Sequence, residues 1–259
     1  MTVQAAEDWL AAPVARPGAE LRLFCLPHAG GGTAAYAALA RLVPEPIDVR
    51  PVRLPGRETR LREAPYRRVA SLVADAVRAL EPLFDRPFAL FGHSLGALLA
   101  FELAHRLREE GGPEPVHLFV SGRRAPHVPD PEPPLSLLPD ERLVDELRRR
   151  YDGIPQAVVE TPELLELFLP ILRADCELLD TYAYAEREPL QVPISAFTGA
   201  DDRRVGPDDL AGWARHTSGA FRARVLPGGH FYFQGDEEAL AAELERDLAR
   251  VAPARSGPA

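Results

Sequence analysis

Short apolar runs alternate with longer amphipathic segments along most of the chain. The apolar runs, rich in β-forming residues, lie at 21–26, 47–54, 88–91, 116–121, 192–197 and 221–226. The segments between them place apolar residues at helical spacing and lie at 33–43, 66–83, 95–110, 207–217 and 237–251. Strands that alternate with helices favour parallel pairing, because a parallel connection must cross over the sheet. The pattern therefore predicts an α/β fold with a mostly parallel central sheet and helices on both faces.

The alternation breaks between residues 125 and 188. Six prolines lie between 126 and 139, and two helical segments, 140–151 and 161–184, follow with no strand between them. The second segment carries more apolar surface than a solvated helix needs. We expect a helical lid inserted over the strand ends, with a simple extension of the core as the alternative.

Composition narrows the class of protein. The chain has 259 residues, a net charge of −9, 46% hydrophobic residues and two cysteines. The length fits one large α/β domain, or at most two small ones, and we expect a single domain over residues 1–259 with flexible ends at 1–15 and 252–259. The acidic balance disfavours a nucleic-acid partner, and the longest uncharged stretch, 87–101, is too short to span a bilayer. Without a signal peptide, a disulfide framework or metal-ligand spacing, we expect a cytoplasmic protein without a metal.

A candidate nucleophile follows the apolar run at 88–91. The sequence Gly92-His93-Ser94-Leu95-Gly96 leads directly into a helical segment. This is the G-x-S-x-G pattern in its strand, turn, helix setting, where small residues on either side let the turn close and present the serine hydroxyl above the sheet. We predict that Ser94 is a catalytic nucleophile.

A serine hydroxyl needs a general base, and the base needs an acid to orient it. Gly228-Gly229-His230 follows the last apolar run, and among seven histidines only His230 lies in a glycine-preceded turn at a strand exit. We predict His230 as the base.

The strand, turn, helix setting of Ser94 resembles that of the α/β-hydrolase fold, in which the chain order is serine, acid, histidine. The resemblance implies an orienting acid after residues 192–197. Asp201 and Asp202 both occur there. We favour Asp202, keep Asp201 as the close alternative, and regard Asp175 and Asp180 in the insertion as more distant candidates.

Acyl transfer also needs donors for the oxyanion, each contributing roughly 2.7 to 4 kcal/mol. One should be the backbone N–H of Leu95, directly after the nucleophile. The second should come from the glycine-rich loop after the first strand, where Ala29 is our first choice and Gly30 the next. These parts together predict a serine hydrolase that works through an acyl-serine.

The motifs together resemble those of the type II thioesterases, the free-standing editing enzymes of polyketide and nonribosomal peptide synthetases, which are related to medium-chain fatty acyl thioesterases. The resemblance spans roughly residues 20–250. It rests on Pro27-His28-Ala29-Gly30-Gly31, Arg53-Leu54-Pro55-Gly56-Arg57-Glu58, Gly92-His93-Ser94-Leu95-Gly96-Ala97, Gly199-x-x-Asp202 and Gly228-Gly229-His230-Phe231. It implies an acyl or aminoacyl substrate in thioester linkage to the phosphopantetheine arm of a carrier domain, in antibiotic-type biosynthesis. The substrate then carries the phosphopantetheine, and the enzyme needs no cofactor.

A local concentration of arginines contrasts with the acidic chain. It comprises Arg53, Arg57, Arg60, Arg62, Arg67 and Arg68. Acyl and peptidyl carrier domains are typically acidic, so a basic rim would steer one electrostatically. We predict that His28, Arg57 and Arg60 contact the substrate or a transiently bound carrier, and that the protein is a monomer. The alternative is an ordinary solvated loop and helix face.

Two other functions fit the same residues. A carboxylesterase or acyltransferase would use the same triad on oxygen esters. A binding or scaffold protein would keep the fold without catalysis, which the complete set of Ser94, Asp202 and His230 disfavours.

Overall fold

The computed structural model describes residues 3–12, 14, 16–151, 158 and 160–250. The flexibility expected for residues 252–259 concerns a segment outside the described residues. The flexibility expected for 1–15 contrasts with the burial of Trp9 and Leu10, which pack into the core beside helix α1 (Val3–Asp8). Leu10 also forms an isolated antiparallel bridge with Val52.

A six-stranded sheet forms the centre of the molecule, with the order β2-β1-β3-β4-β5-β6 and every neighbouring pair parallel. Its strands are β1 (Leu21–Leu26), β2 (Ile47–Pro51), β3 (Phe88–His93), β4 (His117–Ser121), β5 (Ile194–Gly199) and β6 (Phe221–Leu226). The predicted α/β class with a parallel sheet is confirmed.

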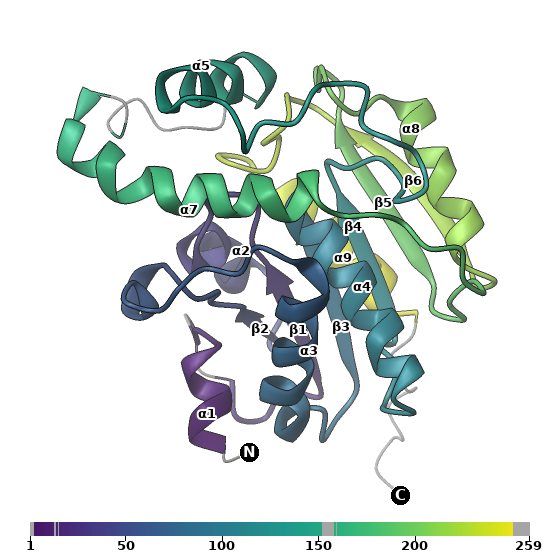
Figure 1. Ribbon diagram of the computed structural model, residues 1–259. Coiled ribbons are helices and arrows are strands. Elements are labelled where there is room, and N and C mark those ends of the chain that lie inside the picture. Colours follow the sequence, from purple (N-terminus) through teal and green to yellow (C-terminus); the bar gives the residue numbers. More distant parts are fainter. Residues whose placement is uncertain (1–2, 13, 15, 152–157, 159, 251–259) are drawn as a thin grey trace, which may run out of the picture.

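Helices cover both faces of this sheet (Figure 1). On one face, Phe24 and Leu26 of β1 pack in a cluster with α3 (Val69–Leu80) and α4 (Leu95–Glu109). On the other, Leu23 and Cys25 pack with helices α2 (Ala37–Leu42) and α9 (Glu237–Leu248). Successive side chains of a strand point to opposite faces, so an apolar run without alternation is buried on both. The remaining helical elements are α8 (Pro207–Ala211), η1 (Thr33–Tyr36), η2 (Glu58–Arg60), η3 (Glu81–Leu83) and η4 (Gly212–His216).

The insertion contributes two further helices, α5 (Asp140–Tyr151) and α7 (Pro162–Asp180), which lie above the sheet in Figure 1. We call the segment 125–188 the cap. Its helices share a small apolar cluster of their own, formed by Leu135, Leu143, Leu147, Leu172 and Cys176. This cluster faces the carboxyl ends of the strands, where the predicted site residues lie. Among the described helices, none has the length and apolar content needed to cross a bilayer.

Candidate active site

Ser94 occupies the sharp turn between β3 and α4. Its backbone has φ +55° and ψ −113°, one of two non-glycine positive φ values in the described residues. The flanking glycines are sterically required: a Cβ on Gly92 would lie 2.0 Å from the carbonyl oxygen of Gly96, and one on Gly96 would lie 2.1 Å from that of Leu26. Strained backbone of this kind persists only where its surroundings enforce it, and it concentrates at functional sites.

The loop after β6 brings His230 to the same edge of the sheet. Its Nδ1 lies 2.8 Å from Oδ2 of Asp202, in the loop after β5. Its Nε2 is buried and has no hydrogen-bond partner among the described residues. Ser94 and His230 both line two adjoining cavities. Ser94 and His230 therefore border a shared space.

Asp202 is held from its other side by two backbone amides. Its Oδ1 accepts hydrogen bonds from the N–H groups of Arg204 (2.8 Å) and Val205 (3.2 Å). Burial alone would raise the pKa of Asp202, but the hydrogen bond and charge of His230, together with these amides, outweigh burial and lower it. Asp202 is therefore a carboxylate at neutral pH, able to orient a His230 Nδ1–H group.

The alternative acids have other positions or partners. Asp201 is exposed. The carboxylate of Asp180 accepts the backbone N–H groups of Leu135 and Ser136 at 3.0 and 2.7 Å. Asp175 forms an ion pair with Arg57. Of the four candidates, only Asp202 contacts His230.

The two residues predicted to supply the oxyanion donors lie at the same site as Ser94. Leu95 is the first residue of α4, and amides of a first helical turn have no preceding carbonyl to bind. Ala29 lines a cavity together with Ser94. The amide of Gly30, our second choice, donates to Oδ2 of Asp175 at 2.8 Å and is already engaged. The geometry thus favours Ala29 over Gly30.

The two cavities that meet at Ser94 differ in character. The first lies under the cap and is mostly apolar, and its wall includes Ala29, Leu135, Leu147, Leu172, Cys176, Leu179 and Phe231. The second is polar and is lined by Gly122, Arg123, Arg124, Asp130, Arg204 and Val205, among others. Tyr151 borders both. An apolar acyl chain fits the first cavity by its chemistry, and a polar group fits the second.

His28 and His93 pack against this site in their neutral forms. Burial, together with the nearby His230 and Arg57, lowers the pKa of His28 to about 4. Burial lowers the pKa of His93 well below its ordinary value, and its Nδ1 lies 2.9 Å from the hydroxyl of Ser121. His28 lines the apolar cavity, where its predicted substrate contact stays a prediction.

The structure corrects one residue of the predicted basic rim, Arg57, and pairs others with acidic side chains, while the predicted contact of Arg60 stays a prediction. Arg57 is only 5% exposed, and its guanidinium donates to the carbonyl of Gly31 (2.7 Å) and to Asp175 (2.8 Å), so it cannot reach a docked partner. Arg60 pairs with Glu63 and lies over the ring of Trp9 at 4.4 Å. Acidic neighbours also pair with Arg53, Arg67 and Arg68. The sequence shows the positive charges but not their partners, one of which is 118 residues away.

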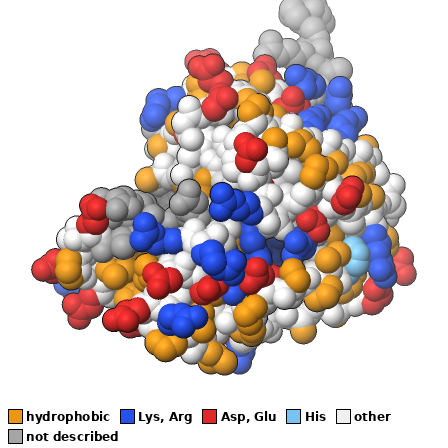
Figure 2. Space-filling view, turned by 90° about the horizontal axis from the view of Figure 1, so that it is seen from above, with side chains coloured by type: hydrophobic (Ala, Val, Ile, Leu, Met, Phe, Trp, Pro, Cys, Tyr) orange, Lys and Arg blue, Asp and Glu red, His pale blue; other side chains and the backbone are white. Residues whose placement is uncertain are grey.

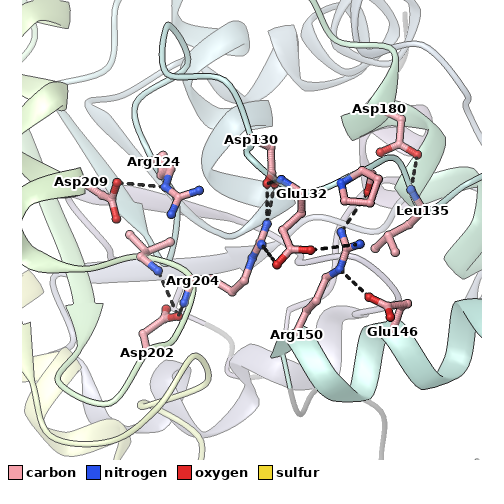
Figure 3. A network of polar contacts seen from close by, with 12 residues as sticks. Arg124, Asp130, Glu132, Leu135, Glu146, Arg150, Asp180, Asp202, Arg204 and Asp209 are labelled. Atoms are coloured by element: carbon pink, nitrogen blue, oxygen red, sulfur yellow. Dashed lines mark hydrogen bonds and ion pairs between the residues drawn. The ribbon is translucent and has the colours of Figure 1, made fainter.

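A network of ion pairs missed in the sequence joins the acid loop to the cap (Figure 3). Arg204, two residues after the acid, pairs with Asp130 (2.6 Å) and Glu132 (3.4 Å). Glu132 in turn pairs with Arg150 of α5 at 3.5 Å. Arg204 is thus a link between the loop that carries Asp202 and the first cap helix. The sequence signal was the arginine that directly follows Asp201-Asp202-Arg203.

A second Ser, His and Asp grouping lies in the core. The Oγ of Ser195 lies 2.9 Å from Nε2 of His117 and donates to Oδ2 of Asp247 at 2.6 Å. Arg224 also binds Asp247. These side chains connect β4, β5 and β6 to α9, and none of them lines the two cavities at Ser94. Their geometry is that of a buried hydrogen-bond network that ties α9 to the sheet.

Comparison with known proteins agrees with this geometry. The thioesterase domain family matches residues 21–248. The gramicidin S biosynthesis protein GrsT of Aneurinibacillus migulanus is 40% identical over 224 residues, which cover 86% of this chain and 87% of that protein. The structure of RedJ, a thioesterase of the prodiginine pathway of Streptomyces coelicolor, superposes with a TM-score of 0.85 at 40% identity, covering 92% of this chain and 96% of RedJ. The type II thioesterase BorB of the borrelidin cluster gives 0.84 at 38% identity, with 93% and 97% covered.

Proposed function

The chain belongs to the thioesterase domain family and is a thioesterase, and from this premise we propose that it releases acyl or aminoacyl groups from the phosphopantetheine arms of carrier domains. By this proposal it edits stalled or wrongly loaded modules of a polyketide or nonribosomal peptide synthetase. GrsT, RedJ and BorB, which are named for the biosynthesis of gramicidin S, prodiginine and borrelidin, support it, as does YbtT, a type II thioesterase of the yersiniabactin NRPS/PKS pathway that is 30% identical to this chain.

The observation that carries the mechanism is the hydrogen bond between Asp202 and His230, with the second ring nitrogen of His230 left free beside Ser94. In our proposal the Oγ of Ser94 attacks the thioester carbonyl while Nε2 of His230 takes the hydroxyl proton. Asp202 holds the ring and stabilises the imidazolium that forms. The amides of Ala29 and Leu95 bind the oxyanion of the tetrahedral intermediate.

Collapse of this intermediate breaks the C–S bond. The imidazolium of His230 gives its proton to the departing thiolate, which leaves as the pantetheine thiol, and the acyl group stays on Ser94. A water molecule then gives a proton to His230 and attacks the acyl-serine. The second tetrahedral intermediate releases the free acid and returns the proton to Oγ of Ser94.

The proposed partner is an acyl or peptidyl carrier domain that binds transiently. Figure 2 looks onto the cap side and shows arginine side chains gathered near the middle of this face, with acidic side chains among them. A cleft that reaches His230 is lined by Arg148, Arg149, Arg150 and Arg203, and Asp201 is the acidic residue among the described residues that line it. Arg149 and Arg150 pair with Glu132 and Glu146, so the docking proposal rests mainly on the exposed Arg203. This cleft replaces the rim around Arg57 as the candidate docking surface for an acidic carrier.

The two free cysteines support our expectation of a reducing cytoplasm.

The test uses acyl carrier and peptidyl carrier proteins loaded with a series of acyl groups. Intact-mass spectrometry should show loss of the acyl group with the wild-type protein and none with Ser94→Ala. A Ser195→Ala variant serves as the matched control, because it removes the serine of the buried network, and it should keep turning over. Release by Ser94→Ala at the wild-type rate would refute the mechanism.

The same experiment includes thioesters and matched oxygen esters of one acyl chain. A higher kcat/KM on the thioester supports the proposed function. Preference for the oxygen ester would instead support the carboxylesterase or acyltransferase reading.

A further inference from the structure

The Arg53-Leu54-Pro55-Gly56-Arg57-Glu58 run has no part in the proposed chemistry, yet its Arg57 side chain binds the loop that carries the Ala29 amide and its Glu58 side chain binds Thr33, the residue directly after that loop. We propose that Arg57 and Asp175 are positioning residues that set the oxyanion loop, residues 28–32, and that they make its geometry depend on cap helix α7. This inference rests on the proposed function, because it concerns the oxyanion site used there.

The oxyanion loop cannot hold itself in place through side chains. Gly30, Gly31 and Gly32 have none, and Gly30 has φ +71°. One hydrogen bond lies within the loop, from the Gly31 N–H to the His28 carbonyl at 2.9 Å. Glycine has the largest conformational freedom of any residue, so an amide beside three glycines needs external restraint.

Arg57 and Asp175 supply this restraint through three linked contacts. Asp175 accepts the Gly30 N–H on Oδ2 and the Arg57 guanidinium on Oδ1, both at 2.8 Å. The same guanidinium donates to the Gly31 carbonyl at 2.7 Å. The N–H of the Ala29–Gly30 peptide and the carbonyl of the Gly31–Gly32 peptide are thus both tied to one ion pair, which restrains the backbone directly after Ala29.

The pair is built for positioning rather than for contact with solvent. Asp175 is 1% exposed and Arg57 is 5% exposed. A guanidinium presents its donors in a rigid planar fork, so it can bind a carboxylate and a carbonyl at fixed angles, which a lysine ammonium cannot do. Both charges are neutralised within the pair, as burial requires.

Asp175 lies on α7, so the restraint crosses from the cap to the catalytic loop. The helix also packs directly on the loop, since a Cβ on Gly30 would lie 2.6 Å from a methyl group of Leu172. On the other side of the loop, Glu58 accepts the N–H of Thr33 at 2.7 Å. A displacement of α7 would therefore release Gly30 and Gly31 while the Thr33 end stayed bound. The oxyanion donor is in position only while α7 is docked.

The test compares Asp175→Asn with Glu177→Gln. Asparagine keeps the shape and can accept the Gly30 N–H, but it loses the charge that holds Arg57. The Glu177 control is matched, because this residue lies on the same helix and pairs with Arg67 at 2.5 Å, but that pair is solvent-exposed and does not touch the loop. Rates are expressed per active serine titrated with a fluorophosphonate, so that misfolded protein does not count.

We expect Asp175→Asn to lower kcat about 10- to 100-fold and to leave KM within about threefold of wild type. This loss of kcat is no larger than the loss caused by removing one oxyanion donor. A trifluoromethyl ketone analogue adds to the serine and places an oxyanion at the same site. Its affinity should fall by the same factor as kcat/KM. Glu177→Gln should leave all three quantities within about twofold.

Arg57→Lys keeps the charge without the fork and provides a second variant should Asp175→Asn not fold. It should show the same joint loss of kcat and ketone affinity. Variants that melt earlier but keep wild-type kcat per active serine and wild-type ketone affinity would overturn the inference and leave a purely structural ion pair. Failure of the proposed function would be distinguishable, because the wild-type protein would then not hydrolyse thioesters. In that case the variants can be compared with the wild type on whichever ester the wild type cleaves.

Discussion

Asp201 and Asp202 are adjacent in the chain but point into different surroundings. Asp202 is turned inward by His230 and by the amides of Arg204 and Val205, whereas Asp201 is exposed beside the arginine-lined cleft. Adjacent residues in a turn direct their side chains differently, so only one of the two can orient the base.

We expect Asp202→Asn to lower kcat about 10³- to 10⁴-fold, since the amide would favour the wrong tautomer of His230. Asp201→Asn should leave kcat on a small thioester within about twofold of wild type. Steady-state kinetics on an N-acetylcysteamine thioester measure both. Equal losses in the two variants would contradict the assignment of Asp202.

Sequence patterns located the residues of the site but not all of their partners. Ser94 and His230 were predictable because each follows a strand in a glycine-marked turn, and parallel strands bring their carboxyl ends to one edge. The ion pair of Arg57 was not predictable, because its partner Asp175 comes from an insertion whose placement over the sheet depends on tertiary packing. An arginine alone does not reveal whether it faces water or a buried carboxylate.

At the scale of elements, the strands and the long helices were the most predictable. The run predicted at 221–226 has the same bounds as strand β6. The helix predicted at 95–110 is one residue longer than helix α4. Segment 33–43 instead divides into η1 and α2, and 207–217 divides into α8 and η4. Helices this short have little stability of their own, so tertiary contacts decide where each one ends.

Helix α7 forms a wall of the apolar cavity through Leu172, Cys176 and Leu179. Cys176→Leu adds carbon atoms to this wall and should shorten the longest accepted acyl chain by about two carbons. At about 0.8 kcal/mol per buried CH₂, kcat/KM on octanoyl relative to butyryl thioester should fall about tenfold. Leu164→Ala is the control, because Leu164 lies on the exposed part of α7 at 46%. An unchanged chain-length profile in Cys176→Leu would place the acyl chain elsewhere.

At the scale of the whole molecule, buried histidines make stability depend on pH. Burial lowers the pKa of His105 to about 3 and the pKa values of His117 and His216 to about 4. Below about pH 6.5 the unfolded chain binds protons at these residues and the folded protein does not. The free energy of unfolding therefore falls as pH decreases from about 6.5 towards 4, by up to about 1.4 kcal/mol per pH unit for each group.

Urea unfolding at pH 7 and pH 5 measures this effect. The wild type should be less stable at pH 5, and His105→Gln should lose less stability between the two pH values than the wild type. A free energy of unfolding that rises towards pH 5 would show that these imidazoles are protonated in the folded state.

The charge distribution also yields a prediction for carrier docking. Arg203 is exposed and lines the cleft next to His230. Arg203→Gln should raise KM for a carrier-bound acyl group about three- to tenfold, and the difference should shrink with added salt. KM for the N-acetylcysteamine thioester should stay unchanged. The control is Arg246→Gln, on the exposed surface of α9, which should leave KM unchanged for both the carrier-bound substrate and the small thioester. If both substrates respond equally to Arg203→Gln, the cleft does not dock the carrier.

The strained turn at Ser94 constrains how the sequence of this protein can evolve. A side chain held at φ +55° stores about 1 to 3 kcal/mol of backbone strain, which a glycine at the same position would release. The Ser94→Gly protein should therefore have a higher melting temperature and no catalytic activity. Selection for stability alone would replace the serine, so the serine persists only while selection also maintains catalysis.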